Sequence, residues 1–110
     1  MPEYKHVVLL RFSPHTARED IAEIYESLDE LKEKIPGIVD ICGGPYDSSE
    51  GLNKGFTHAF IVTFAEEEFR DEYLGNPDHE VVKQLIVKQL AGGLADVIAF
   101  DFKVCDRFRY

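Results

Sequence analysis

The sequence predicts a single α+β domain over residues 1–110, with strands and helices in the order β-α-β-β-α-β. Segments 5–12, 56–64 and 96–105 are rich in β-branched and aromatic residues, which favour strands. Segment 16–35 carries apolar residues at steps of three and four, as an amphipathic helix does. The length of 110 residues matches the usual size of one domain.

Composition and charge exclude several classes of partner. A net charge of −9 argues against binding to nucleic acid or to an anionic membrane surface. No apolar run approaches the roughly 20 residues that span a bilayer, and the N-terminus does not resemble a signal peptide. The two cysteines, Cys42 and Cys105, are too isolated for a disulfide scaffold or a metal site. We therefore expect a soluble cytoplasmic protein with no nucleic-acid or membrane partner, no cofactor and no metal.

The first strand, residues 5–12, is apolar on both faces, with His6 on one of them. Pro14 ends it, because proline cannot extend a strand ladder. Thr16 and Glu19 have the spacing of a capping box, which predicts a helix start at Thr16. The helix should pack one face on the sheet through Ile21, Ile24, Tyr25, Leu28, Leu31 and Ile35. Pro36-Gly37 should end it.

The second half of the chain begins with a short strand at 38–42, and Gly43-Gly44-Pro45 should open a loop that runs to Gly55. Segment 56–64 follows as a central strand, because neither of its faces is polar.

Two more helices and a last strand complete the chain. A helix at 66–74 starts with three glutamates, which favour a helix N-terminus. Asn76 and Pro77 are a favoured cap and first residue for a helix that should reach residue 91. The apolar residues that this helix should direct toward the core are Val81, Val82, Leu85, Ile86 and Leu90. The last strand is predicted at 96–105.

This order of elements is the ferredoxin-like arrangement, which places the helices on one face of a four-stranded antiparallel sheet. The other face then has no cover from the same chain. Because the strands at 5–12 and 56–64 are apolar on both faces, that face should not be in water. We therefore expect a homodimer in which the sheet faces of two copies meet.

Five segments carry a resemblance to a known family. They are KHVVLLRF at 5–12, IPGI at 35–38, EGLNKGFTHAFIVTF at 50–64, EYLGNPDHE at 72–80 and AFDF at 99–102. Together they resemble the stress-responsive dimeric α/β-barrel family, called Dabb. The resemblance implies a homodimer whose two sheets close into a barrel. The family includes a plant stress protein that assembles into rings and a plant polyketide cyclase that closes a ring by an aldol reaction without a cofactor.

The resemblance implies that His79 is a catalytic histidine and that Tyr73 and His6 belong to the same pocket. A neutral histidine can accept a proton near neutral pH, and a tyrosine hydroxyl can donate to a developing enolate oxygen. Each residue also has a structural alternative. His6 would be a half-buried histidine bonded to backbone, His79 a surface residue in a first helical turn, and Tyr73 a core anchor.

Two further features bear on this site. The free backbone amides at the start of the helix create a positive electrostatic field there. This field should lower the pKa of His79 and keep its ring neutral. A second pocket tyrosine of the cyclase falls at Leu28 in this chain, and Tyr25, one turn earlier, does not match it.

The remaining polar candidates have simpler interpretations. We expect His58 to be structural, linked to a neighbouring strand or the partner chain, and His15 to be solvated. Asn53 and Lys54 are either solvated loop residues or part of a pocket rim or dimer contact. Gly43-Gly44 lacks the pattern of a phosphate-binding loop.

Two classes of function follow. One is a small-molecule-binding protein, with a cofactor-free lyase or cyclase activity on an apolar or carbonyl ligand. The other is a non-enzymatic, stress-associated structural dimer. A cavity that touches His6, Tyr73 and His79 would favour the first class, and a filled interior the second. The sequence leaves open the ligand, the presence of any enzyme activity, a bound divalent cation and assembly beyond the dimer.

Overall fold

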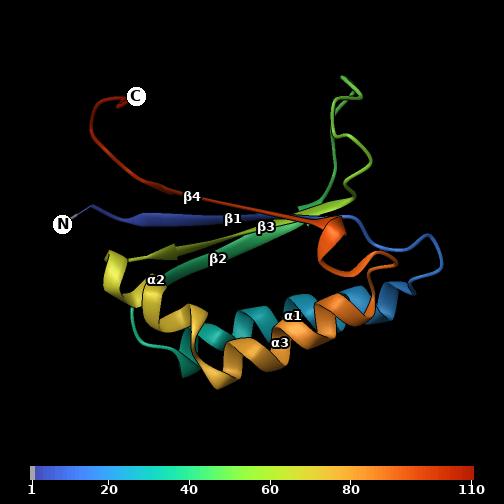
Figure 1. Cartoon of the computed structure of the whole chain (residues 1–110), viewed down its shortest axis with the longest axis horizontal. Coiled ribbons are helices and arrows are strands. Elements are labelled where there is room, and N and C mark those ends of the chain that lie inside the picture. Colours follow the sequence, from blue (N-terminus) through green and yellow to red (C-terminus); the bar gives the residue numbers. More distant parts are fainter. Residues whose placement is uncertain (1) are drawn as a thin grey trace.

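The computed structural model describes residues 2–110, which form a four-stranded antiparallel sheet with all helices on one face (Figure 1). The strands lie in the order β2-β3-β1-β4, so β1 and β3 are central. The elements are β1 (Tyr4–Leu10), α1 (Arg18–Lys34), β2 (Ile38–Pro45), β3 (His58–Phe64), α2 (Glu67–Leu74), α3 (Pro77–Lys88), the 3₁₀-helix η1 (Gly93–Asp96) and β4 (Val97–Lys103). This arrangement confirms the predicted ferredoxin-like α+β fold.

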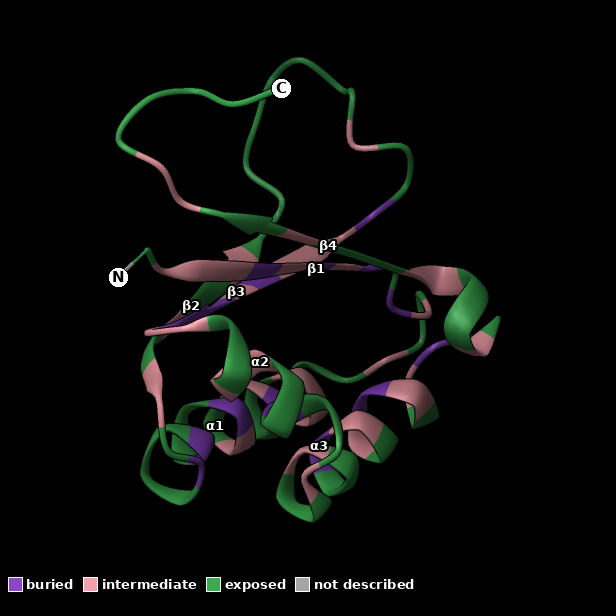
Figure 2. Ribbon diagram, turned by 60° about the vertical axis from the view of Figure 1, so that its left-hand side comes forward, coloured by how far each residue is buried: buried purple, intermediate pink, exposed green. Residues whose placement is uncertain are grey.

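The hydrophobic core lies between the central strands and the helices. Side chains alternate along a strand, so β1 and β3 each turn every second residue toward the helices. Figure 2 shows buried residues on these two strands and on the inner sides of the helices. From α1, Leu28 and Leu31 are each 1 % exposed. The predicted stripe of α1 is therefore confirmed, and Ile35 ends the helix as expected.

No element within residues 2–110 covers the opposite face of the sheet. Phe100 is 65 % exposed, Phe102 46 % and Ile98 43 %, all on β4. We call this surface the open sheet face; it consists of Val7, Leu9, Ile61, Ile98, Phe100 and Phe102. The β2–β3 loop and the C-terminal segment both leave the sheet on this side (Figure 1). No helix within residues 2–110 is long and apolar enough to cross a bilayer.

The predicted capping box at the start of α1 is wrong. The N-cap is Ala17, and no side chain caps the helix. The Thr16 hydroxyl donates instead to the backbone carbonyl of Gln89 at 3.2 Å, and the Ser13 amide donates to the same oxygen at 3.2 Å. The last carbonyls of a helix lack partners inside the helix. Thr16 therefore satisfies the end of α3 rather than the start of α1.

Strand β2 is longer than predicted. Gly43, Gly44 and Pro45 continue it and pair with Phe60, Ala59 and His58 of β3. Proline is tolerated here because β2 is an edge strand. A Cβ atom on Gly43 would lie 2.4 Å from the carbonyl oxygen of Ala59, so the close pairing requires glycine.

The helix α3 is shorter than predicted and its inner face is narrower. It ends at Lys88, and Val81 is 63 % exposed. Val82 and Ile86 are buried, one turn apart on the side that meets the sheet and α1. Val81 is rotated by about 100° from Val82, which places it in solvent.

The buried stripe of α1 gives a test of this packing. Replacing Leu28 or Leu31 with alanine should lower the free energy of unfolding by roughly 2–5 kcal/mol, because a buried side chain is lost and a cavity remains. Glu26, exposed on the same helix, is the matched control; its change to alanine should cost less than about 0.5 kcal/mol. Denaturant unfolding measures both, and leucine variants as mild as the control would contradict the packing.

Candidate functional site

A cavity of about 240 Å³ lies between the helix-covered face of the sheet and the helices α2 and α3. Its walls are mainly aliphatic and aromatic side chains from β1, α1, β3, α3, η1 and β4. Three predicted site residues, His6, Tyr73 and His79, all line it. The structure therefore brings together residues that are far apart in the sequence, and the partly open cavity has the apolar character of a small-molecule site.

Tyr73 stands at the centre of this group. It lies on α2 and is 1 % exposed. Its ring centroid is 4.1 Å from that of His79, 5.7 Å from that of His6 and 5.1 Å from that of Phe64. Burial, together with the negative charge of Asp101, raises the pKa of the Tyr73 phenol. The phenol therefore stays protonated at neutral pH and is able to donate a hydrogen bond.

His79 is positioned by the start of α3. The Asn76 side chain accepts a hydrogen bond from the Asp78 amide at 2.8 Å, and Pro77 occupies the first turn, as predicted. These features fix the direction in which the helix leaves α2. His79 then lies in the first helical turn, directly against the ring of Tyr73.

The environment of His79 favours a neutral ring. Burial lowers its pKa, and the positive charges of His6 and Lys83 act in the same direction, whereas Glu80 and the Leu74 carbonyl oppose them. The predicted direction is confirmed, but burial rather than the helix field is its first cause. Within residues 2–110, His79 Nδ1 is buried and has no hydrogen-bond partner of good geometry, although the Leu74 carbonyl lies near enough to the ring to act on its pKa.

His6 is bonded to Asp101, which is in turn bonded to Arg70, and the sequence analysis did not predict this pair of charged residues. Its Nδ1 lies 2.6 Å from Oδ1 of Asp101, the residue opposite it on β4. Arg70 of α2 donates to the other oxygen, Oδ2, at 2.7 Å. Partial burial opposes ionisation of Asp101, but the bonds from His6 and Arg70 outweigh it and lower the pKa of this carboxyl. Because an ionised carboxylate only accepts, Nδ1 carries the proton.

Asp101 has only a weak signal in the sequence, where it is a single carboxylate between Phe100 and Phe102. Its pairing with His6 depends on the register between β1 and β4. The alternation of apolar and polar residues along each strand does not predict that register.

Leu28 also lines the cavity, at the position where the resemblance places a second pocket tyrosine. Tyr25 does not replace that tyrosine. Its hydroxyl donates to the carbonyls of Ala59, at 2.8 Å, and Gly44, at 3.4 Å, and burial raises its pKa to about 12. Tyr25 is therefore a structural link between α1 and the sheet.

The other polar candidates lie away from this cavity. The ring of His58 lies 2.9 Å from the hydroxyl of the adjacent Thr57, and it also packs against Phe12, just after β1, and Tyr25 of α1. Burial lowers its pKa. His15 is exposed, as expected. Asn53 donates to the Phe56 carbonyl at 2.8 Å and shapes the β2–β3 loop. Within residues 2–110, no group of three or more acidic, histidine or cysteine residues could hold a metal ion.

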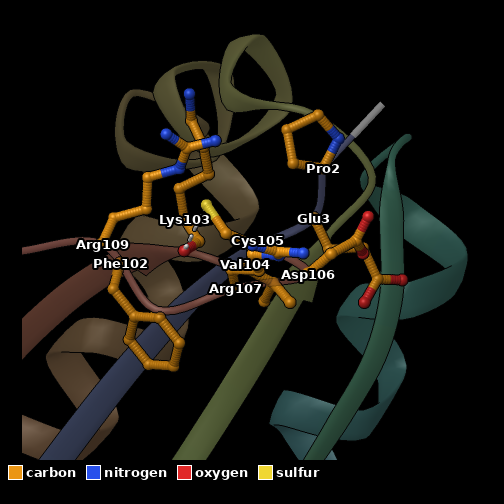
Figure 3. Close-up of a pocket in the computed structure, with 9 residues that line it drawn as sticks. All are labelled: Pro2, Glu3, Phe102, Lys103, Val104, Cys105, Asp106, Arg107 and Arg109. Atoms are coloured by element: carbon orange, nitrogen blue, oxygen red, sulfur yellow. Dashed lines mark hydrogen bonds between the residues drawn. The ribbon is translucent and has the colours of Figure 1, made fainter.

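A wider hollow lies beside the C-terminal segment, at the end of β4 (Figure 3). Basic side chains from Lys103, Arg107 and Arg109 line it together with the acidic Glu3 and Asp106. Its lining residues include no histidine or tyrosine and mix charges of both signs. The smaller cavity, with its three adjoining rings, is therefore the candidate functional site.

Two curated relatives are similar over most of the chain. The stress-response A/B barrel domain-containing protein HS1 of Arabidopsis thaliana is 30% identical over 99 residues, which cover 90% of this chain and 87% of that protein. Olivetolic acid cyclase of Cannabis sativa is 27% identical over 75 residues, which cover 68% of this chain and 74% of the cyclase.

Two solved structures show the same fold. A dimeric ferredoxin-like protein of unknown function from Jannaschia sp. CCS1 has a TM-score of 0.84 at 24% identity, covering 93% of this chain and 99% of that one. The hydroxynitrile lyase of Passiflora edulis has a TM-score of 0.84 at 16% identity, covering 97% of each chain. The profile of the stress responsive A/B barrel domain matches residues 4–104. The chain therefore belongs to the stress-responsive A/B barrel (Dabb) family.

Proposed function

We propose that this protein is a homodimer that binds a small carbonyl compound in the cavity and performs cofactor-free lyase or cyclase chemistry on it. The observation that carries the proposal is the contact of three rings, His6, Tyr73 and His79, on the wall of an otherwise apolar cavity. The names of two similar proteins, a cyclase and a hydroxynitrile lyase, agree with this class of reaction.

The proposed step is removal of a proton from a carbon next to the carbonyl group. His79 accepts the proton, and the electrons of the broken C–H bond move to the carbonyl oxygen as an enolate. We assign Nε2 as the accepting atom, because Nδ1 is buried. The hydroxyl of Tyr73 donates to the enolate oxygen and stabilises its charge. The enolate carbon can then attack a second carbonyl: the new C–C bond forms as the π bond of that carbonyl breaks, and the resulting alkoxide takes the proton back from His79.

His6 has a supporting role in this proposal. The bond to Asp101 fixes its ring orientation and puts its proton on Nδ1. Arg70 in turn fixes the carboxylate. His6 thus presents its opposite edge near Tyr73 in one orientation, which positions the phenol and the substrate oxygen.

A proton-exchange assay tests this chemistry without knowledge of the natural substrate. In D₂O, wild-type protein should accelerate loss of the α-proton NMR signals of small aryl and alkyl ketones. His79→Gln should reduce that acceleration by about 10²–10⁴-fold, the usual contribution of a general base. Tyr73→Phe should also reduce it, and His15→Gln, at an exposed site, should not. Failure of every ketone to exchange faster than in buffer would contradict the enzymatic proposal.

A non-enzymatic structural dimer is the second candidate. It is favoured by the 30% identity to a protein named for stress response and by the exposed apolar side chains of the open sheet face. Both candidates require the dimer. They differ in the cavity, which has no role in a purely structural protein.

The dimer has its own test. Phe100→Asp places a charge on the open sheet face and should convert the protein into monomers, because obligate interfaces are large and apolar. Val81→Asp is the matched control, since Val81 is 63 % exposed and Phe100 is 65 % exposed, but Val81 lies on α3. Sedimentation at micromolar concentration should give twice 12.6 kDa for wild type and the control. A monomeric wild type would overturn the dimer.

A further inference from the structure

The cavity wall carries one side chain of fixed charge, Lys83, which the proposed chemistry does not use. Lys83 follows His79 by four residues on α3, so the two side chains lie on the same face of the helix. It is half-buried, and its positive charge acts on His79. Its position is thus next to the reacting groups, at the polar part of an apolar cavity.

The carboxylate one helical turn before Lys83 does not form an ion pair with it. Glu80, one turn away, accepts a hydrogen bond from Gln84 at 2.9 Å. Within residues 2–110, Lys83 forms no ion pair. This is notable in a chain with a net charge of −9. Because Lys83 lines the cavity and has no ion-pair partner there, an anionic group of a ligand could pair with its ammonium.

We propose that Lys83 selects ligands with an anionic group, a carboxylate, attached to the apolar body that fills the cavity. This inference rests on the proposed function, because it places the carbonyl of the same ligand at Tyr73 and His79. Along a helix, four residues rise about 6 Å. The two anchoring residues are thus one helical turn apart along α3, and the ligand we propose to span them is a short oxo-carboxylic acid.

The size of the cavity limits the ligand. A cavity of about 150 Å³ holds benzene, and this one measures about 240 Å³. A substituted ring or a short acyl chain would fit. The net negative charge of the chain repels a carboxylate ligand. The positive charge of Lys83 is therefore the feature that would let the cavity bind a carboxylic acid.

Binding of a matched pair of probes tests the selection. Cinnamate and cinnamamide share one shape and differ in charge. Wild-type protein should bind cinnamate at least about tenfold more tightly in calorimetry, since hydrogen bonds to charged groups are strong. Lys83→Met should abolish this ratio. Lys83→Arg should keep it, and so should Lys88→Met, which removes an exposed lysine from the same helix.

The outcomes separate this inference from the proposed function. If both probes bind equally to wild type, or if Lys83→Met keeps the preference, Lys83 does not select anions, although the cavity still binds ligands. If neither probe binds and neutral ketones leave the NMR signals of His79 and Tyr73 unchanged, the proposed function and the inference are both wrong. A preference for cinnamate that disappears in Lys83→Met alone supports the inference.

Discussion

The polar end of the cavity depends on the packing of one ring, that of Tyr73. Its ring lies between His6 on the sheet and His79 on α3, and it is in edge contact with Phe64 of the core. Because α2 ends at Leu74 and α3 begins at Pro77, a fixed Tyr73 also fixes the start of α3 and the position of His79. The same burial that anchors the ring keeps its phenol protonated. Tyr73 is therefore able to be both an anchor of the core and the proposed hydrogen-bond donor.

The two faces of the sheet serve different purposes on the same strands. On β1, His6 and Val8 line the cavity, while Val7 and Leu9 belong to the open sheet face. The candidate site and the proposed dimer interface thus lie back to back, separated by the thickness of one sheet. A partner that covers the open sheet face would restrain β1 and β4, and hence the bond between His6 and Asp101. In the proposed dimer, assembly would therefore stabilise the geometry of the site.

Element order, the inner stripe of α1 and the start of α3 could be predicted, because each follows from local spacing or from a cap. That His6, Tyr73 and His79 share one cavity was expected only through a family resemblance, and their chemical roles stay a prediction. The pair Arg70 and Asp101 was missed, since their contact depends on strand register and on the placement of α2 over the sheet. The prediction for Thr16 failed for the same reason. Its spacing to Glu19 fits a capping box, but its hydroxyl donates to the carbonyl of Gln89, which is distant in sequence. Local chemistry was thus predictable, and contacts set by tertiary placement were not.

The proposed function requires that the fold hold His79 as a neutral ring beside Tyr73, where it can accept a proton. NMR titration of the His79 ring tests it directly, with the exposed His15 in the same spectrum as an internal reference. Burial and the nearby positive charges lower the pKa of His79, so its signals should titrate below about 6.5, the usual value for histidine. They should shift when a cavity ligand is added, whereas those of His15 should not. A His79 pKa at or above the usual value would contradict the account, because the site would then lack its base at neutral pH.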